Sequence, residues 1–132
     1  MSRDKKDLHP TLASAYETAC ELYKAKYPSE PQPFLSCTFR SNNEQNALYN
    51  IGRTVKGSIV TNAKGGQSPH NFNPSLAFDI AFIGLNKKLS WDKKYFKMFA
   101  DLIISEQVEW GGSWKFTDAP HFELKGWKNM IK

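Results

Sequence analysis

Two stretches of the chain have the apolar periodicity of an amphipathic helix. In residues 9–28, apolar side chains recur three to four positions apart, at Leu12, Tyr16, Ala19, Leu22 and Tyr23. In residues 89–107 the apolar face is broader and is made of Trp91, Phe96, Met98, Phe99, Leu102 and Ile103. Ser90 is the expected N-cap of this second helix. Both patterns predict helices that turn one face toward a core.

A shorter helix is predicted after residue 41 by its end signals rather than by its apolar face. Ser41 is followed three positions later by Glu44, which is the capping-box pattern. Gly52 stands where such a helix would end, because glycine readily adopts the left-handed conformation common at that position.

Alternation of apolar and polar residues predicts the strands. In residues 76–84 the large apolar side chains fall on one face, and the opposite face carries Asp79 between two alanines. Toward the C-terminal end, His121 and Glu123 share one face of a second strand, and phenylalanine and leucine share the other. A third strand is predicted at Phe34–Phe39 from its aromatic and small residues.

The remaining segments complete the predicted fold. Residues 58–75 are expected to contain a short strand and then a long loop rich in glycine, asparagine, serine and proline. Residues 125–132 are expected to form a short basic tail. The order helix, strand, helix, strands, helix, strand predicts an α+β fold, in which residues 1–132 form a single domain with a small, mostly antiparallel sheet flanked by helices.

Composition supports one packed core and limits the partners. The chain has 132 residues, of which 40% are hydrophobic and 23% charged. Its net charge of +5 comes mostly from scattered lysines, which solubilise the surface and would also attract a polyanion such as an anionic cell wall. The sequence has no clustered basic stripe or known nucleic-acid motif, so we expect no nucleic-acid partner.

The sequence lacks several features that would mark a secreted, membrane-bound or disulfide-linked protein. The polar N-terminal segment predicts no signal peptide, and no apolar run is long enough for a membrane span. Cys20 and Cys37 form no metal-binding or redox motif, and we expect both to be reduced. We expect the protein to be a monomer.

Two of the three histidines stand next to predicted strands that carry carboxylates. His70 precedes the strand that contains Asp79, and His121 begins another strand. Catalytic zinc takes three protein ligands from histidine and carboxylate residues and leaves a position for water. Either Asp118 or Glu123 could then activate that water. The third histidine lies in the polar N-terminal segment and is expected to cap a helix or lie at the surface.

Four ordered motifs connect these residues to a known family. The motifs are Ser68-Pro69-His70, Ala77-Phe78-Asp79, Trp110-Gly111-Gly112-Ser113-Trp114 and Asp118-Ala119-Pro120-His121-Phe122. Residues 34–125, most of the chain, resemble the M15-type zinc peptidases, which have the fold of D-Ala-D-Ala peptidases. The likeness is greatest to phage endolysins and bacterial wall enzymes that act as L-alanyl-D-glutamate peptidases.

The resemblance assigns roles to individual positions. His70, Asp79 and His121 match the zinc ligands of the family. Asp118 matches the carboxylate that takes a proton from the attacking water. Arg40 matches an arginine that holds the substrate or stabilises the developing oxyanion.

Other matches are less specific, and one feature departs from the family. Ser68 and Gln45 match recurrent family positions, and Trp114 is expected to line a substrate cleft, with core packing as its alternative. His70 and Asp79 are nine positions apart, a longer spacing than is usual in the family. We expect the longer loop to leave both ligands in place and to affect how substrate fits beside it.

The implied function is a zinc endopeptidase that degrades peptidoglycan by hydrolysing the L-alanyl-D-glutamate bond of the stem peptide. Similar endolysins of bacteriophages are made in the host cytoplasm and act on the cell wall after release, so lysis is the expected context. The alternatives are a D,D-carboxypeptidase or dipeptidase of the same family, a non-catalytic zinc-containing domain that binds the wall, and a basic nucleic-acid-binding module. Asp118 argues against the non-catalytic domain.

Overall fold

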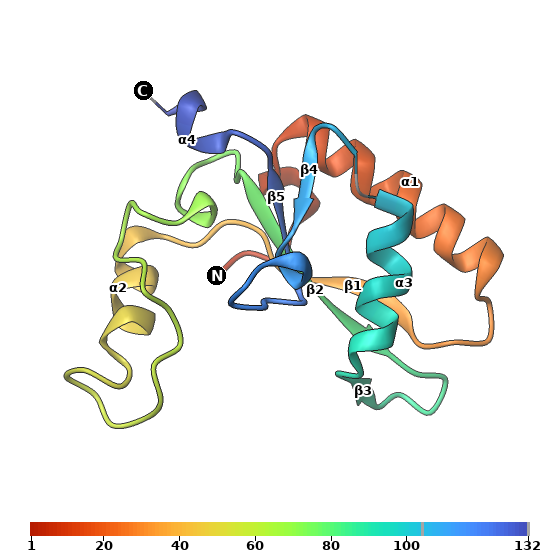
Figure 1. Ribbon diagram of the computed structural model, residues 1–132, viewed down its shortest axis with the longest axis horizontal. Coiled ribbons are helices and arrows are strands. Elements are labelled where there is room, and N and C mark those ends of the chain that lie inside the picture. The colour runs from red at the N-terminus through yellow and green to blue at the C-terminus, as the bar shows by residue number, and fades with distance from the viewer. Residues whose placement is uncertain (104, 132) are drawn as a thin grey trace.

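The strands form one sheet in which every pairing between named strands is antiparallel (Figure 1). The computed structural model describes residues 1–103 and 105–131. The strand order is β1-β2-β5-β4, and the short β3 pairs with β2 outside this path. The strands are β1 (Gln32–Cys37), β2 (Ala77–Ile83), β3 (Leu89–Ser90), β4 (Val108–Trp110) and β5 (His121–Leu124). The predicted α+β fold with a mostly antiparallel sheet is confirmed.

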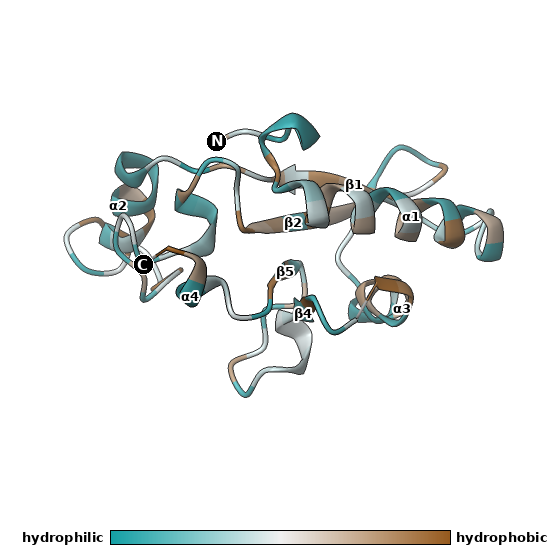
Figure 2. Cartoon of the chain, turned by 90° about the horizontal axis from the view of Figure 1, so that it is seen from above, coloured by the Kyte–Doolittle hydropathy of each residue, from teal (hydrophilic) through white to brown (hydrophobic). Residues whose placement is uncertain are grey.

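The helices gather toward two ends of the molecule. They are α1 (Pro10–Lys26), α2 (Asn42–Asn50), α3 (Lys93–Ile103) and α4 (Trp127–Met130), with short 3-10 turns η1 (Lys5–Asp7), η2 (Pro69–Asn71) and η3 (Gly111–Ser113). Figures 1 and 2 both place α1 and α3 at one end of the molecule and α2 and α4 at the other. Among the described residues, the helices are too short or too polar to cross a bilayer.

The core lies between one face of the sheet and the helices α1 and α3. Phe78 in β2 and Phe122 in β5 are fully buried and stack with their ring centroids 5.3 Å apart. Tyr16 of α1 packs edge-on against Phe78, and Phe99 of α3 packs edge-on against Phe122. Burial of each such ring contributes roughly 1.5–3 kcal/mol. The predicted apolar face of the strand at residues 76–84 is therefore confirmed, and the opposite face is left for polar side chains.

The segment that follows α2 departs from the prediction. Residues 58–62 form no regular strand, so the short strand expected there is wrong. Side chains of the preceding segment bind this backbone instead of a neighbouring strand. Arg53 donates to the carbonyl of Thr61 at 3.0 Å, and Gln45 donates to the carbonyl of Ala63 at 2.9 Å. These contacts satisfy backbone groups that would otherwise need a sheet partner.

Helix α3 begins later and ends earlier than its pattern predicts. Ser90 lies in β3, so the expectation that it caps the helix is wrong. Asp92 supplies the capping contact, because its carboxylate accepts a hydrogen bond from the backbone N–H of Lys94 at 3.0 Å. The helix ends at Ile103, and residues 105–107 are not helical.

Two further boundaries differ from the predicted ones. β1 begins two residues earlier than predicted and ends at Cys37, beyond which the backbone N–H of Thr38 donates to Ser2 instead of to the sheet. The C-terminal segment is more than a basic tail, because it contains α4. Gly126 adopts a left-handed conformation, with φ of 70°, and the buried Trp127 then anchors the helix to the core.

Replacement of Phe122 by alanine is expected to lower the free energy of unfolding by about 3–5 kcal/mol, because a buried aromatic ring leaves a cavity. Phe116→Ala is the matched control, since that ring is 86% exposed, and its effect should stay within about 0.5 kcal/mol. Urea unfolding of the two variants measures the difference. Equal stability of the two variants would contradict the assigned core.

Candidate active site

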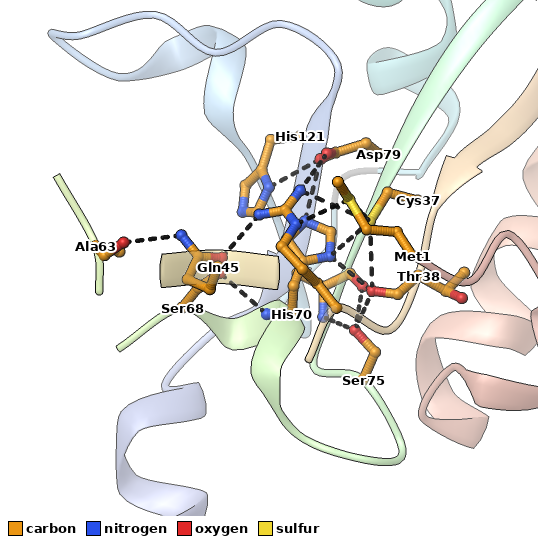
Figure 3. A network of polar contacts seen from close by, with 12 residues as sticks. Met1, Cys37, Thr38, Gln45, Ala63, Ser68, His70, Ser75, Asp79 and His121 are labelled. Atoms are coloured by element: carbon orange, nitrogen blue, oxygen red, sulfur yellow. Dashed lines mark hydrogen bonds and ion pairs between the residues drawn. The ribbon is translucent and has the colours of Figure 1, made fainter. Parts of the chain in front are cut away.

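Three side chains from two strands and a turn converge at the sheet (Figure 3). The pairing of β2 with β5 places Asp79 directly opposite His121, and η2 brings His70 to the same point. Asp79 Oδ1 lies 3.3 Å from His70 Nε2 and 3.1 Å from His121 Nδ1. The structure thus brings together the three residues that the sequence proposed as metal ligands.

The turn that carries His70 is fixed by its own sequence. The hydroxyl of Ser68 accepts a hydrogen bond from the backbone N–H of His70 at 3.2 Å, and Asn71 accepts one from the backbone N–H of Ser68 at 3.1 Å. These two contacts form a capping box around η2. Pro69 occupies the first position of the turn, where a missing N–H costs nothing. His70 and Asp79 are therefore in contact despite the unusually long stretch of sequence between them.

Each histidine uses its second ring nitrogen to hold its orientation. His70 Nδ1 lies 2.7 Å from the carbonyl oxygen of Thr38, and His121 Nε2 lies 2.8 Å from Glu123 Oε1. A carbonyl or carboxylate can only accept, so each of these ring nitrogens donates. When the rings are neutral, the nitrogens that face Asp79 carry lone pairs. Metal-ligating histidines commonly have this arrangement.

Two of the three separations between the proposed donor atoms fit a tetrahedral ion. Zinc lies about 2.0–2.1 Å from nitrogen and oxygen ligands, so two of its ligands in a tetrahedron are about 3.3 Å apart. The two observed separations from Asp79 Oδ1, 3.3 Å to His70 and 3.1 Å to His121, agree with this value. The donor set of two imidazoles and one carboxylate also suits zinc.

Electrostatics couples the same three groups. Burial alone would raise the pKa of Asp79, but the charges of His70 and His121 hold it well below its usual range. Burial disfavours the charged forms of the histidines, yet the neighbouring Asp79 raises the pKa of His70 to about 10 and helps to raise that of His121 to about 9. Positive charge is therefore stabilised at this point, and protons compete there with a metal cation.

Two glycines explain how Asp118 reaches the site. The backbone N–H of Asp118 donates to the carbonyl of Gly111 at 2.9 Å, and a Cβ on Gly111 would lie only 2.5 Å from the Asp118 carbonyl oxygen. A Cβ on Gly112 would lie 2.0 Å from the ring of Trp110. No other residue fits at either position without displacing its neighbours. The Trp-Gly-Gly-Ser-Trp motif is therefore a packing device that holds the Asp118 loop against β4.

Asp118 lines a cleft of about 350 Å³ together with the three converging residues. Asp118 is exposed overall, yet partial desolvation of its carboxyl beside the cleft raises the pKa above its usual value, and the nearby His121 charge only partly offsets this effect. A carboxylate with a raised pKa is a better proton acceptor than an ordinary aspartate. Glu123 forms a hydrogen bond with His121 and orients its ring. Asp118 is therefore the cleft carboxylate that is available to accept a proton.

Arg40 lies beside the metal-ligand candidates. Its guanidinium is 3.8 Å from Asp79 Oδ2 and donates to Gln45 Oε1 at 2.9 Å, while its backbone N–H donates to the carbonyl of His70 at 2.9 Å. Arg40 lines the cleft, so its positive charge is available to a bound carbonyl or carboxylate. The hydrogen bond to Gln45 holds that charge in place.

Two of the three residues proposed for substrate binding line the cleft, and the third does not. Ser68 and Trp114 line the cleft, and the Trp114 ring packs 5.4 Å from that of His121. Gln45 is 1% exposed and does not line the cleft. Its amide joins Arg40 to the backbone of Ala63, so its observed contacts position other groups.

Sequence reasoning missed two neighbours of the site, Cys37 and Thr38. The Cys37 Sγ lies 3.8 Å from His70 Nδ1 and could join His70 and Asp79 in a metal-binding group. His70 Nδ1, however, already contacts the Thr38 carbonyl. Cys37 and Thr38 approach the site because β1 pairs with β2, and this pairing places Cys37 opposite Asp79. No local pattern signals this long-range pairing. Cys20 and Cys37 form no disulfide with each other.

An antiparallel sheet that presents two histidines and an aspartate beside a cleft carboxylate is the arrangement of a metallopeptidase. Comparisons with known proteins agree. A profile of peptidase family M15, described as D-alanyl-D-alanine carboxypeptidase, matches residues 61–124. The peptidoglycan L-alanyl-D-glutamate endopeptidase CwlK of Bacillus subtilis is 36% identical over an alignment of 128 positions, and the match covers 89% of this chain and 74% of that protein. The chain therefore belongs to the M15 peptidases and is a peptidase.

Two solved structures share the fold. The L-Ala D-Glu endopeptidase ChiX of Serratia marcescens superposes with a TM-score of 0.68 and 22% identity, covering 95% of this chain and 86% of that one. The L,D-carboxypeptidase DacB of Streptococcus pneumonia gives a TM-score of 0.50 and 22% identity, covering 96% and 71%. At these identities the two structures establish the architecture.

Glu123→Gln is expected to weaken zinc binding by roughly 10–100-fold, because His121 loses the carboxylate that fixes its ring and raises its basicity. Competition against a chelating dye measures the affinity. Glu106→Gln is the matched control, because Glu106 is exposed and outside the cleft, and it should bind zinc like the parent protein. Unchanged affinity in Glu123→Gln would contradict the orienting role.

Proposed function

We propose that the protein is a zinc endopeptidase that hydrolyses the L-alanyl-D-glutamate bond in the stem peptide of peptidoglycan. The observation that carries the proposal is the contact of His70 and His121 with one oxygen of Asp79 at separations suited to zinc. The bond specificity is supported by the similarity to CwlK, which has that activity.

In this proposal His70, Asp79 and His121 hold the zinc ion. Zinc would supply a Lewis acid that activates water and polarises the peptide carbonyl. Because Thr38 and Glu123 fix the two imidazole rings, the three ligands need little rearrangement to receive the ion. Preorganised ligands lower the cost of binding.

Asp118 acts as the general base. Its carboxylate takes a proton from water as the water oxygen attacks the alanyl carbonyl carbon, and it returns that proton to the amine as the C–N bond breaks. Arg40 faces the cleft and stabilises the negative charge that develops on the carbonyl oxygen. Ser68 and Trp114 contact the substrate from the cleft wall.

The partner and setting follow from the same proposal. The substrate is a carboxylate-rich wall polymer, and the net charge of +5 favours its approach. We propose that residues 1–132 act as one monomeric catalytic domain without a nucleic-acid partner. The resemblance to phage endolysins supports a lytic enzyme that is made in the host cytoplasm and reaches the wall after release.

A carboxypeptidase is the second candidate. The matching family profile is described as a D-alanyl-D-alanine carboxypeptidase, and the structurally similar DacB is an L,D-carboxypeptidase. Both reactions would use the same metal ligands and base, and only the position of the stem peptide in the cleft would differ. Product analysis separates the two.

Incubation with purified peptidoglycan should release fragments with a newly formed amino end at D-glutamate, and a zinc chelator should abolish them. Mass spectrometry of the soluble products provides the measurement. Release of D-alanine alone would move the protein to the carboxypeptidase reaction. Absence of any cleavage by folded, zinc-loaded protein would refute the catalytic proposal.

Asp118→Asn is expected to reduce kcat/KM by roughly 100-fold or more while zinc affinity is retained, because the amide cannot accept the proton. Asp101→Asn, at an exposed position of α3, is the matched control and should leave kcat/KM unchanged.

The pH profile gives an independent test of Asp118. The base must be ionised, and partial desolvation of the Asp118 carboxyl raises its pKa. Activity should therefore fall as pH decreases through a value above about 3.9, the ordinary pKa of aspartate. The log of kcat/KM against pH, measured at saturating zinc, should show this acidic limb in the parent. The same limb at full amplitude in Asp118→Asn would assign it to another group.

A further inference from the structure

A second cavity adjoins the candidate active-site cleft. It has a volume of about 630 Å³ and shares three wall residues with the cleft, namely Thr61, Ala63 and Gln67. Its far side is formed by α4, which contributes Trp127 and Lys128. Figures 1 and 2 place α2, the segment after it and α4 at the same end of the molecule. A ligand that fills the cleft can therefore continue over one short stretch of backbone into this cavity.

The shared wall is held firmly although it has no regular secondary structure. Arg53 donates to the carbonyl of Thr61 and to the side chain of Asn62, both at 3.0 Å. The same guanidinium stacks 3.8 Å from the ring centroid of Tyr49 on α2. The buried Gln45 donates to the carbonyl of Ala63, two residues after Thr61, at 2.9 Å. The wall is thus built before any ligand binds, which lowers the cost of ordering it.

The lining of the cavity combines an apolar floor with a cation. Trp127 is 7% exposed and packs against Phe72, and the partly exposed Ile131 extends the apolar surface. Lys128 is exposed at the rim, with its amine 5.8 Å from the Trp127 ring centroid. Among the described residues that line the cavity, none is acidic, so the charge of Lys128 is not neutralised there. An apolar surface beside an ammonium group suits a small aliphatic residue that bears a free carboxylate.

We propose that this cavity is an accessory subsite for the carboxylate-bearing end of the stem peptide, beyond the two residues that flank the scissile bond. The inference rests on the proposed function, because it takes the cleft as the site of hydrolysis. A stem peptide that ends in D-alanine supplies both a methyl group for the floor and a carboxylate for Lys128. The subsite makes cleavage depend on the length and terminal charge of the peptide.

The test compares two substrates and two charge-reversal variants. The short substrate is N-acetyl-L-Ala-D-Glu, and the long one is N-acetyl-L-Ala-γ-D-Glu-L-Lys-D-Ala. Lys128→Glu removes the proposed contact. Lys125→Glu makes the same change in net charge, but Lys125 lines a different hollow, beside β4. Equal melting temperatures establish that both variants fold.

Lys128→Glu should raise KM for the long substrate by roughly fivefold, with kcat within about twofold, and should leave the short substrate unaffected. Lys125→Glu should behave as the parent protein on both. Amidation of the terminal carboxyl should abolish the difference between Lys128→Glu and the parent.

Several outcomes would overturn the inference. They are equal effects of Lys128→Glu on both substrates, equal effects of the two variants, and an effect that persists after amidation. Failure of the parent protein to cleave either substrate would instead refute the proposed endopeptidase function. The two failures are therefore distinguishable.

Discussion

The pairing register between β2 and β5 is the constraint on which the rest of the site depends. It places Asp79 opposite His121, and the same strands bury Phe78 and Phe122 on the other face. A slip of one residue would turn the carboxylate into the core and the rings into the cleft. The register is therefore fixed by the energy of aromatic burial, and the polar cluster is positioned by a force that has no part in its chemistry.

Desolvation and the attraction between opposite charges act against each other in the cluster of His70, Asp79 and His121. Desolvation disfavours every ionised group in it, yet both imidazoles are held within hydrogen-bonding distance of the Asp79 carboxylate. Thr38 and Glu123 occupy the outer nitrogens, so the inner lone pairs have few alternatives to a proton or a metal. The proposed metal ligands are thus held by the capping contacts of η2, by the carbonyl of Thr38 just after β1 and by the Glu123 side chain of β5, which explains how a small fold keeps them rigid.

Much of this arrangement could be predicted because its signals are local. Alternation in residues 76–84 identified both faces of the central strand, and the capping box of α2 is present as expected. Long-range contacts could not be predicted in this way. The approach of Cys37 to His70 depends on the pairing of β1 with β2. The strand expected near residue 60 failed because Arg53 and its neighbours supply hydrogen bonds that a periodicity argument does not include.

X-ray absorption at the zinc edge of the zinc-loaded protein tests the central claim most directly. With His70, Asp79 and His121 as ligands, the account predicts only nitrogen and oxygen neighbours, at about 2.0–2.1 Å. A sulfur neighbour at about 2.3 Å would place Cys37 in the coordination sphere and contradict the assigned ligand set.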